Sequence, residues 1–145
     1  MGMKLRIFLS CILLCGYAIA LDAKESFGNL RVKEILRVHD GDTFIAHIND
    51  VHPLIGQGIS IRINGIDTPE ITDKNPSVHT LAIQAREYVK ERLQQNVSVE
   101  LRNVRRDKYF RILADVYLDQ QNLADELIAQ GLAKPYHGKT KPIWP

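Results

Sequence analysis

The sequence predicts an α+β fold, a five-stranded β-barrel of the OB-fold type with two or three helices. Five short segments alternate apolar and polar residues, which is the period of a half-buried strand. An amphipathic helical pattern lies between the third and fourth strand segments, and a shorter one follows the fifth. This order differs from the regular alternation of strands and helices in a parallel α/β sheet, and it favours the barrel.

The strand segments are defined by their apolar residues. Isoleucines at 59, 61 and 63 alternate with polar residues and place Arg62 on the opposite face of the strand. Asn, Asp, Pro and Gly residues mark the connections between strands. Strands are expected at 30–39, 43–48, 59–66, 97–102 and 112–118, and loops at 49–58 and 68–80.

Two segments are expected to be helical. In residues 81–94, apolar side chains recur every fourth position and form one stripe. The stripe comprises Leu81, Ala85, Val89 and Leu93, widened by Ala82 and Tyr88. Asn122 is a suitable N-cap for a short helix at 123–130, and Gly131 suits its C-terminal end.

The N-terminal segment has the pattern of an export signal. Lys4 and Arg6 precede an apolar run at 7–19, and a small-x-small pattern ends at Ala20. The run is short for a membrane span, although an uncleaved N-terminal anchor is the alternative. The expected division is a signal peptide at 1–20, a lead-in at 21–29 and one domain at 30–145. We therefore expect a secreted or periplasmic protein.

Removal of this signal changes the composition of the domain. Cys11 and Cys15 would be lost, so the exported domain would contain no disulfide. Lys4 and Arg6 account for two of the 19 basic residues, which leaves 17 basic and 17 acidic residues. With a net charge near zero, affinity for nucleic acid must come from the local placement of charges.

Three acidic residues lie where expected strands meet loops. They are Asp42, Asp67 and Glu70, and Pro69 favours an extended backbone between the last two. If these carboxylates converge, each pair about 4 Å apart repels by roughly 4 kcal/mol at an effective dielectric constant of about 20. A cation would relieve that repulsion. Oxygen ligands, without a Cys or His pair at zinc spacing, favour calcium or magnesium over zinc.

Two arginines could bind phosphate beside these acids. Arg62 and Arg111 have the planar guanidinium group that grips a phosphate through two hydrogen bonds. Arg62 alone could as well be a solvated surface residue. Arg111 also ends the richest basic stretch of the chain, which could contact a polyanion backbone. That stretch comprises Arg102, Arg105, Arg106, Lys108 and Arg111.

Four motifs together resemble the staphylococcal nuclease family over residues from about 30 to 134. They are Asp40-Gly41-Asp42-Thr43, Arg62-Ile63-Asn64-Gly65-Ile66-Asp67-Thr68-Pro69-Glu70, Asp107-Lys108-Tyr109-Phe110-Arg111 and Gln130-Gly131-Leu132-Ala133-Lys134. The resemblance implies a calcium-dependent endonuclease in which water attacks phosphodiester bonds of DNA and RNA. It implies a monomer that has no stable protein partner. After cleavage of the signal, no association with a membrane is expected.

The resemblance also implies roles for individual residues. The implied calcium ligands are Asp42, Asp67 and the backbone carbonyl of Thr68, with Asp40 close to the metal. Arg62 and Arg111 would bind the scissile phosphate, and Glu70 would be the general base. Lys108, Tyr109 and Tyr136 are candidate substrate contacts. The family often has glycine before the second arginine, where this chain has Phe110.

Competing functions are less well supported by the residues. A haloacid-dehalogenase-type phosphatase would need Thr or Val in place of Phe44, and an EF-hand starting at Asp40 would need Gly in place of Ile45. The remaining alternative is a non-catalytic OB-type module that binds nucleic acid or protein. Modules that have lost catalysis usually lack the acids and arginines that all stand here, so the sequence favours the enzyme.

Overall fold

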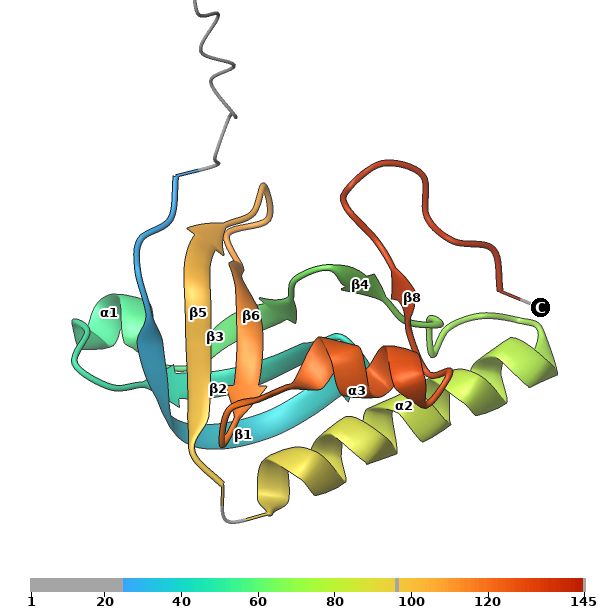
Figure 1. Ribbon diagram of the computed structural model, residues 1–145, viewed down its shortest axis with the longest axis horizontal. Helices are drawn as coiled ribbons and strands as arrows, with labels where there is room; N and C mark the ends of the chain where they lie inside the picture. Colours follow the sequence, from blue (N-terminus) through green and yellow to red (C-terminus); the bar gives the residue numbers. More distant parts are fainter. Residues whose placement is uncertain (1–24, 96, 145) are drawn as a thin grey trace, which may run out of the picture.

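The computed structural model describes residues 25–95 and 97–144 (Figure 1). The expected signal peptide at 1–20 and the first part of the lead-in at 21–29 lie outside the described residues. From Leu30 onward the described chain forms one barrel with helices packed on its outside.

Five strands of the described chain close into a barrel, as predicted. They are β1 (Leu30–Asp40), β2 (Thr43–Ile48), β3 (Ile59–Ile63), β5 (Val99–Arg106) and β6 (Ile112–Leu118). Their order is β3-β2-β1-β5-β6, and a parallel pairing of β6 with β3 closes the ring. The side chains that point into the barrel are its core, and Phe44, Ile61 and Leu101 among them are fully buried. The OB-type fold is therefore confirmed.

Three helices are present in the described chain: α1 (Pro53–Gly56), α2 (Pro76–Gln94) and α3 (Leu123–Ala129). In Figure 1, α2 runs under β1 and α3 lies beside β6. The interpretation of 49–58 as a loop was incomplete, because α1 forms there. Its Pro53 is tolerated in the first turn, where its missing N–H costs nothing, and the His52 ring accepts a hydrogen bond from the Leu54 N–H.

The long helix begins earlier than predicted. The last residues of the expected loop 68–80 are helical, because α2 begins at Pro76 with Asn75 as its N-cap. The buried stripe also differs in part, because Val78 is buried in it, Ala82 is buried as expected, and Leu81 is only half-buried. The stripe is Val78, Ala82, Ala85, Val89 and Leu93. An Asn-Pro pair before an apolar stripe was the signal for this earlier start.

The expected strand at 59–66 is divided by a turn. Gly65 has a φ of 82°, a left-handed conformation that glycine adopts without steric cost, and it separates β3 from β4 (Ile66–Asp67). Strand β4 pairs antiparallel with β8 (Lys134–Pro135). A short β7 (Gln121–Asn122) pairs with the end of β6. The β4–β8 pairing brings the C-terminal segment next to the predicted acidic residues.

A charged pair connects the two longer helices. Arg92 of α2 donates to Glu126 of α3 at 2.7 Å, and the Tyr88 hydroxyl donates to the same carboxylate at 3.2 Å. The hydrogen bond from Arg92 lowers the pKa of Glu126, so that carboxylate stays ionised at neutral pH.

Within the described residues, no helix has the length and apolar character that a membrane crossing requires.

Candidate active site

Arg62 brings the two predicted acidic metal ligands together. Strand register places Arg62 opposite Thr43, so Asp42 lies directly beside the arginine. Arg62 Nη1 is 2.6 Å from Asp42 Oδ2, and Arg62 Nη2 is 3.7 Å from Asp67 Oδ1. The three side chains are 11%, 9% and 4% exposed, respectively. The structure therefore forms a buried cluster of two carboxylates and one guanidinium.

The Asp42 carboxylate is fixed from several sides. The Thr43 hydroxyl donates to it at 2.9 Å, and the Thr68 N–H donates to it at 3.2 Å. Asp40 accepts a hydrogen bond from the Asp42 N–H at 3.2 Å and so holds the turn between β1 and β2. Burial raises the pKa of Asp42, Arg62 lowers it and the Asp40 charge raises it, and the net result is a pKa of about 7.

The two buried carboxylates fit a hard cation better than a soft one. Asp42 and Asp67 offer oxygen donors, and their oxygens lie close enough together to contact one guanidinium. Across residues 25–95 and 97–144, no three Asp, Glu, His or Cys side chains gather closely enough to hold a metal. A divalent ion at this site would therefore use these two carboxylates together with backbone carbonyl or water oxygens.

Glu70 lies outside the buried cluster. Its side chain is 55% exposed, and its Oε1 atom is 2.6 Å from Lys141 Nζ. Lys141 Nζ is also 3.7 Å from Asp67 Oδ1, so one lysine links Glu70 to the buried cluster. The Trp144 Nε1–H donates to Asp67 Oδ2 at 3.4 Å. Sequence reasoning missed Lys141 and Trp144, because no local motif marks them.

A groove of about 760 Å³ contains the remaining predicted residues. Arg62 and Arg111 both line it, although 48 residues of sequence lie between them. The predicted substrate contacts Lys108, Tyr109 and Tyr136 line it as well. The groove thus has cationic and aromatic side chains on its walls, which are the groups that bind nucleic-acid backbones and bases.

Asp107 orients Arg111 within a tight loop. Its Oδ2 accepts from Arg111 Nε at 2.7 Å, and its Oδ1 accepts from the backbone N–H groups of Tyr109 and Arg111 at 2.8 and 3.0 Å. Burial raises the pKa of Asp107, but the hydrogen bonds from Arg111 and Tyr109 outweigh it and lower the pKa overall. The Arg111 guanidinium is therefore held by an ionised carboxylate.

Phe110 has a backbone conformation in this loop that is typical of glycine. Its φ is 64°, a left-handed conformation that is unfavourable for a bulky residue. The Phe110 carbonyl accepts from Arg106 Nη1 at 2.7 Å, which helps to hold the strained backbone in place. The ring itself is 79% exposed, so little burial offsets the strain.

We expect Phe110→Gly to stabilise the fold by about 1 kcal/mol, because glycine removes the left-handed strain. Thermal denaturation would show a higher Tm than that of the wild-type chain. Phe110→Ala is the matched control, since it removes the exposed ring but keeps a Cβ atom and hence the strain. Equal Tm values for the two variants would contradict the explanation.

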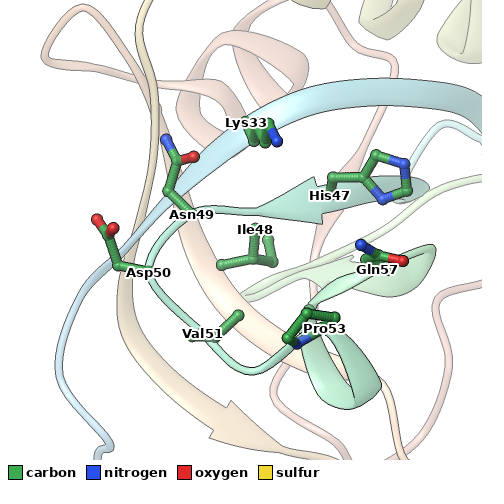
Figure 2. A pocket seen from close by; sticks show the side chains of 9 residues that line it. Lys33, His47, Ile48, Asn49, Asp50, Val51, Pro53 and Gln57 are labelled. Atoms are coloured by element: carbon green, nitrogen blue, oxygen red, sulfur yellow. The ribbon is translucent and has the colours of Figure 1, made fainter.

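A second hollow lies away from the groove. Figure 2 shows this pocket of about 190 Å³, with Lys33, His47, Asp50 and Gln57 among its lining side chains. The His47 ring accepts a hydrogen bond from the Gly58 N–H at 3.0 Å, so part of its polar lining is occupied structurally. It shares no lining residue with the groove and contains none of the predicted site residues.

Comparison with known proteins identifies the family of the chain. A family model described as staphylococcal nuclease homologue matches residues 60–142, more than half of the chain. The chain belongs to the staphylococcal nuclease family. The matched range includes Arg62, Asp67, Glu70 and Arg111, whereas Asp42 precedes it.

Several relatives within the staphylococcal nuclease family align over most of the chain. The thermonuclease of Staphylococcus hyicus is 32% identical over 75% of this chain and 62% of its own length. The thermonuclease of Staphylococcus intermedius is 34% identical over 77% and 64%, and endonuclease YncB of Bacillus subtilis is 33% identical over 74% and 50%. The chain thus spans less than two thirds of the length of these curated relatives.

Proposed function

We propose that this protein is a calcium-dependent endonuclease that hydrolyses phosphodiester bonds in DNA and RNA. The observation that carries the proposal is the placement of Arg62 and Arg111 on one groove, next to the buried Asp42 and Asp67. The names of the thermonuclease and endonuclease relatives support the same activity. A groove of this size, open to solvent and lined by cations, suits a polyanionic strand.

The arginines supply most of the protein's own stabilisation of the reaction. Negative charge grows on the phosphoryl oxygens as water attacks, and two fixed guanidinium groups can bind those oxygens through paired hydrogen bonds. Asp107 holds Arg111, while Asp42 and Asp67 hold Arg62, so neither group must be ordered during the reaction. This preorganisation makes their charge more effective than that of free cations in water.

Glu70 is proposed to accept the proton of the attacking water. A positioned general base contributes about 10²- to 10⁴-fold, or roughly 3–5 kcal/mol. Enzymes lower barriers by roughly 8–23 kcal/mol, and phosphate-ester hydrolysis is among the most demanding reactions. Glu70 therefore supplies the smaller part of the acceleration.

Asp42 and Asp67 are proposed to hold the calcium ion with the backbone carbonyl of Thr68. When bound, the ion supplies positive charge that polarises a phosphoryl oxygen. Lys108, Tyr109 and Tyr136 are proposed to contact the neighbouring nucleotides. We further propose that the protein is exported to the periplasm or medium, which rests on the sequence pattern of the N-terminal segment. That it acts as a monomer is proposed from the family resemblance.

Cleavage of DNA by the purified chain tests this proposal. We expect degradation of DNA with calcium present and a loss of at least about 100-fold when a chelator removes it, since a metal contributes several kcal/mol to charge stabilisation. Restoring calcium in excess of the chelator should restore the rate. DNA binding without cleavage in the presence of calcium would instead support the non-catalytic module.

A further inference from the structure

The C-terminal segment of residues 139–144 turns back over the candidate active site. In Figure 1 the chain leaves β8, loops outward and returns beside the segment that leads into α2. We propose that this segment places Lys141 where it positions the Glu70 carboxylate for the reaction. The inference rests on the proposed function, in which Glu70 is the general base.

The contacts of Lys141 join two acidic residues with different proposed roles. Its Nζ atom lies 2.6 Å from Glu70 Oε1 and 3.7 Å from Asp67 Oδ1. The first distance is that of a short, charge-assisted hydrogen bond, and the second is that of a looser ion pair. Lys141 therefore holds the exposed Glu70 carboxylate at a fixed place relative to the buried Asp67.

The rest of the segment is tied down on both sides of Lys141. The Tyr136 N–H donates to the Gly65 carbonyl at 2.8 Å, directly after the β4–β8 pairing. Lys134 Nζ donates to the Ile143 carbonyl at 2.7 Å and lies 4.7 Å from the centre of the Trp144 ring. These contacts fix where the segment enters and leaves, so Lys141 is presented from an anchored loop.

The solvent exposure of the Lys141–Glu70 ion pair indicates that Lys141 positions Glu70 and contributes little to the stability of the fold. The side chains of Lys141 and Glu70 are 59% and 55% exposed. Ion pairs this exposed contribute little to folding stability, because solvent screens the charges and two long side chains lose freedom. Glu70 has a flexible side chain on an exposed loop, so fixing its carboxylate mainly affects the geometry of proton transfer.

Kinetics of Lys141→Ala test the proposal. We expect kcat for DNA cleavage to fall about 10-fold with KM changed by less than about twofold, since a misplaced base slows the chemical step. Lys141→Arg should restore most of kcat, and the Tm of both variants should stay near that of the wild type. Lys139→Ala is the matched control, because it removes a neighbouring exposed lysine without a contact to Glu70.

A double-mutant cycle with Glu70→Gln identifies the route of the effect. If Lys141 acts through Glu70, adding Lys141→Ala to Glu70→Gln should cost little further activity. An equal loss in both backgrounds, or a rise in KM with unchanged kcat, would overturn the positioning role. An active wild-type enzyme with an unimpaired Lys141→Ala variant would overturn this inference alone, whereas an inactive wild-type chain would overturn the proposed function as well.

Discussion

Replacing Arg62 with alanine is expected to lower the rate of DNA cleavage by at least about 100-fold. A single preorganised donor to a developing oxyanion is worth roughly 2.7–4 kcal/mol, or about 10²- to 10³-fold in kcat. We expect Arg62→Ala to lose at least as much activity as Glu70→Gln, because the general base supplies the smaller share of the barrier reduction. Steady-state kinetics of the two variants under identical calcium conditions would measure the difference.

The same substitution is expected to destabilise the fold. Arg62 pairs with the buried side chains of Asp42 and Asp67, which are 9% and 4% exposed. Its loss would leave Asp42 without its ion-pair partner and Asp67 with only the looser contact to Lys141. Breaking a buried ion pair in this way typically costs about 3–5 kcal/mol. Activity must therefore be measured at a temperature where thermal denaturation shows the variant to be folded.

Arg111→Ala is the matched control for Arg62→Ala. Arg111 lines the same groove but pairs with Asp107, whose side chain is 14% exposed and keeps two backbone hydrogen bonds without the arginine. We expect a similar loss of activity with a smaller loss of stability, about 1 kcal/mol. A folded Arg62→Ala enzyme with near wild-type kinetics would refute the phosphate-binding assignment.

The barrel could be predicted from the sequence because its strands follow a local rule. Alternating side chains at Phe44, Ala46 and Ile48, and at Ile59, Ile61 and Ile63, specify both the strand and its buried face. The ends of elements were less predictable, because they depend on turn chemistry at single residues. Asn75 with Pro76 starts α2, and Gly65 ends β3, within segments whose apolar pattern alone suggested otherwise.

The candidate site was only partly predictable. Arg62 and Asp67 lie in one continuous motif, but their proximity to Asp42 follows from the β2–β3 register, which no local pattern specifies. Lys141 and Trp144 could not be predicted, since they reach the site through the β4–β8 pairing and a returning loop. Contacts between distant segments depend on tertiary packing, whereas the motifs record only residue identity.

Gly41→Ala is expected to destabilise the fold and reduce activity together. A Cβ atom at Gly41 would lie 2.7 Å from the Ala85 Cβ of α2 and 2.9 Å from the Thr68 Cγ2 atom. Overpacking of this kind typically costs about 1–3 kcal/mol, because the neighbouring elements must move apart. Movement of Thr68 would also disturb its N–H donation to Asp42, so we expect cleavage to slow in the folded variant as well.

Two further variants separate the packing effect from a general loss of stability. Gly56→Ala would place a Cβ atom of α1 against the Val51 side chain, so it should lower the Tm while sparing the activity of the folded protein. Ala85→Gly removes the atom that Gly41→Ala would strike, although glycine inside a helix costs about 1 kcal/mol by itself. In the double variant, Gly41→Ala should therefore lower the Tm less than it does alone. Strictly additive Tm losses would contradict this explanation, because they would show that the close contact with α2 is not the reason for a glycine next to Asp42.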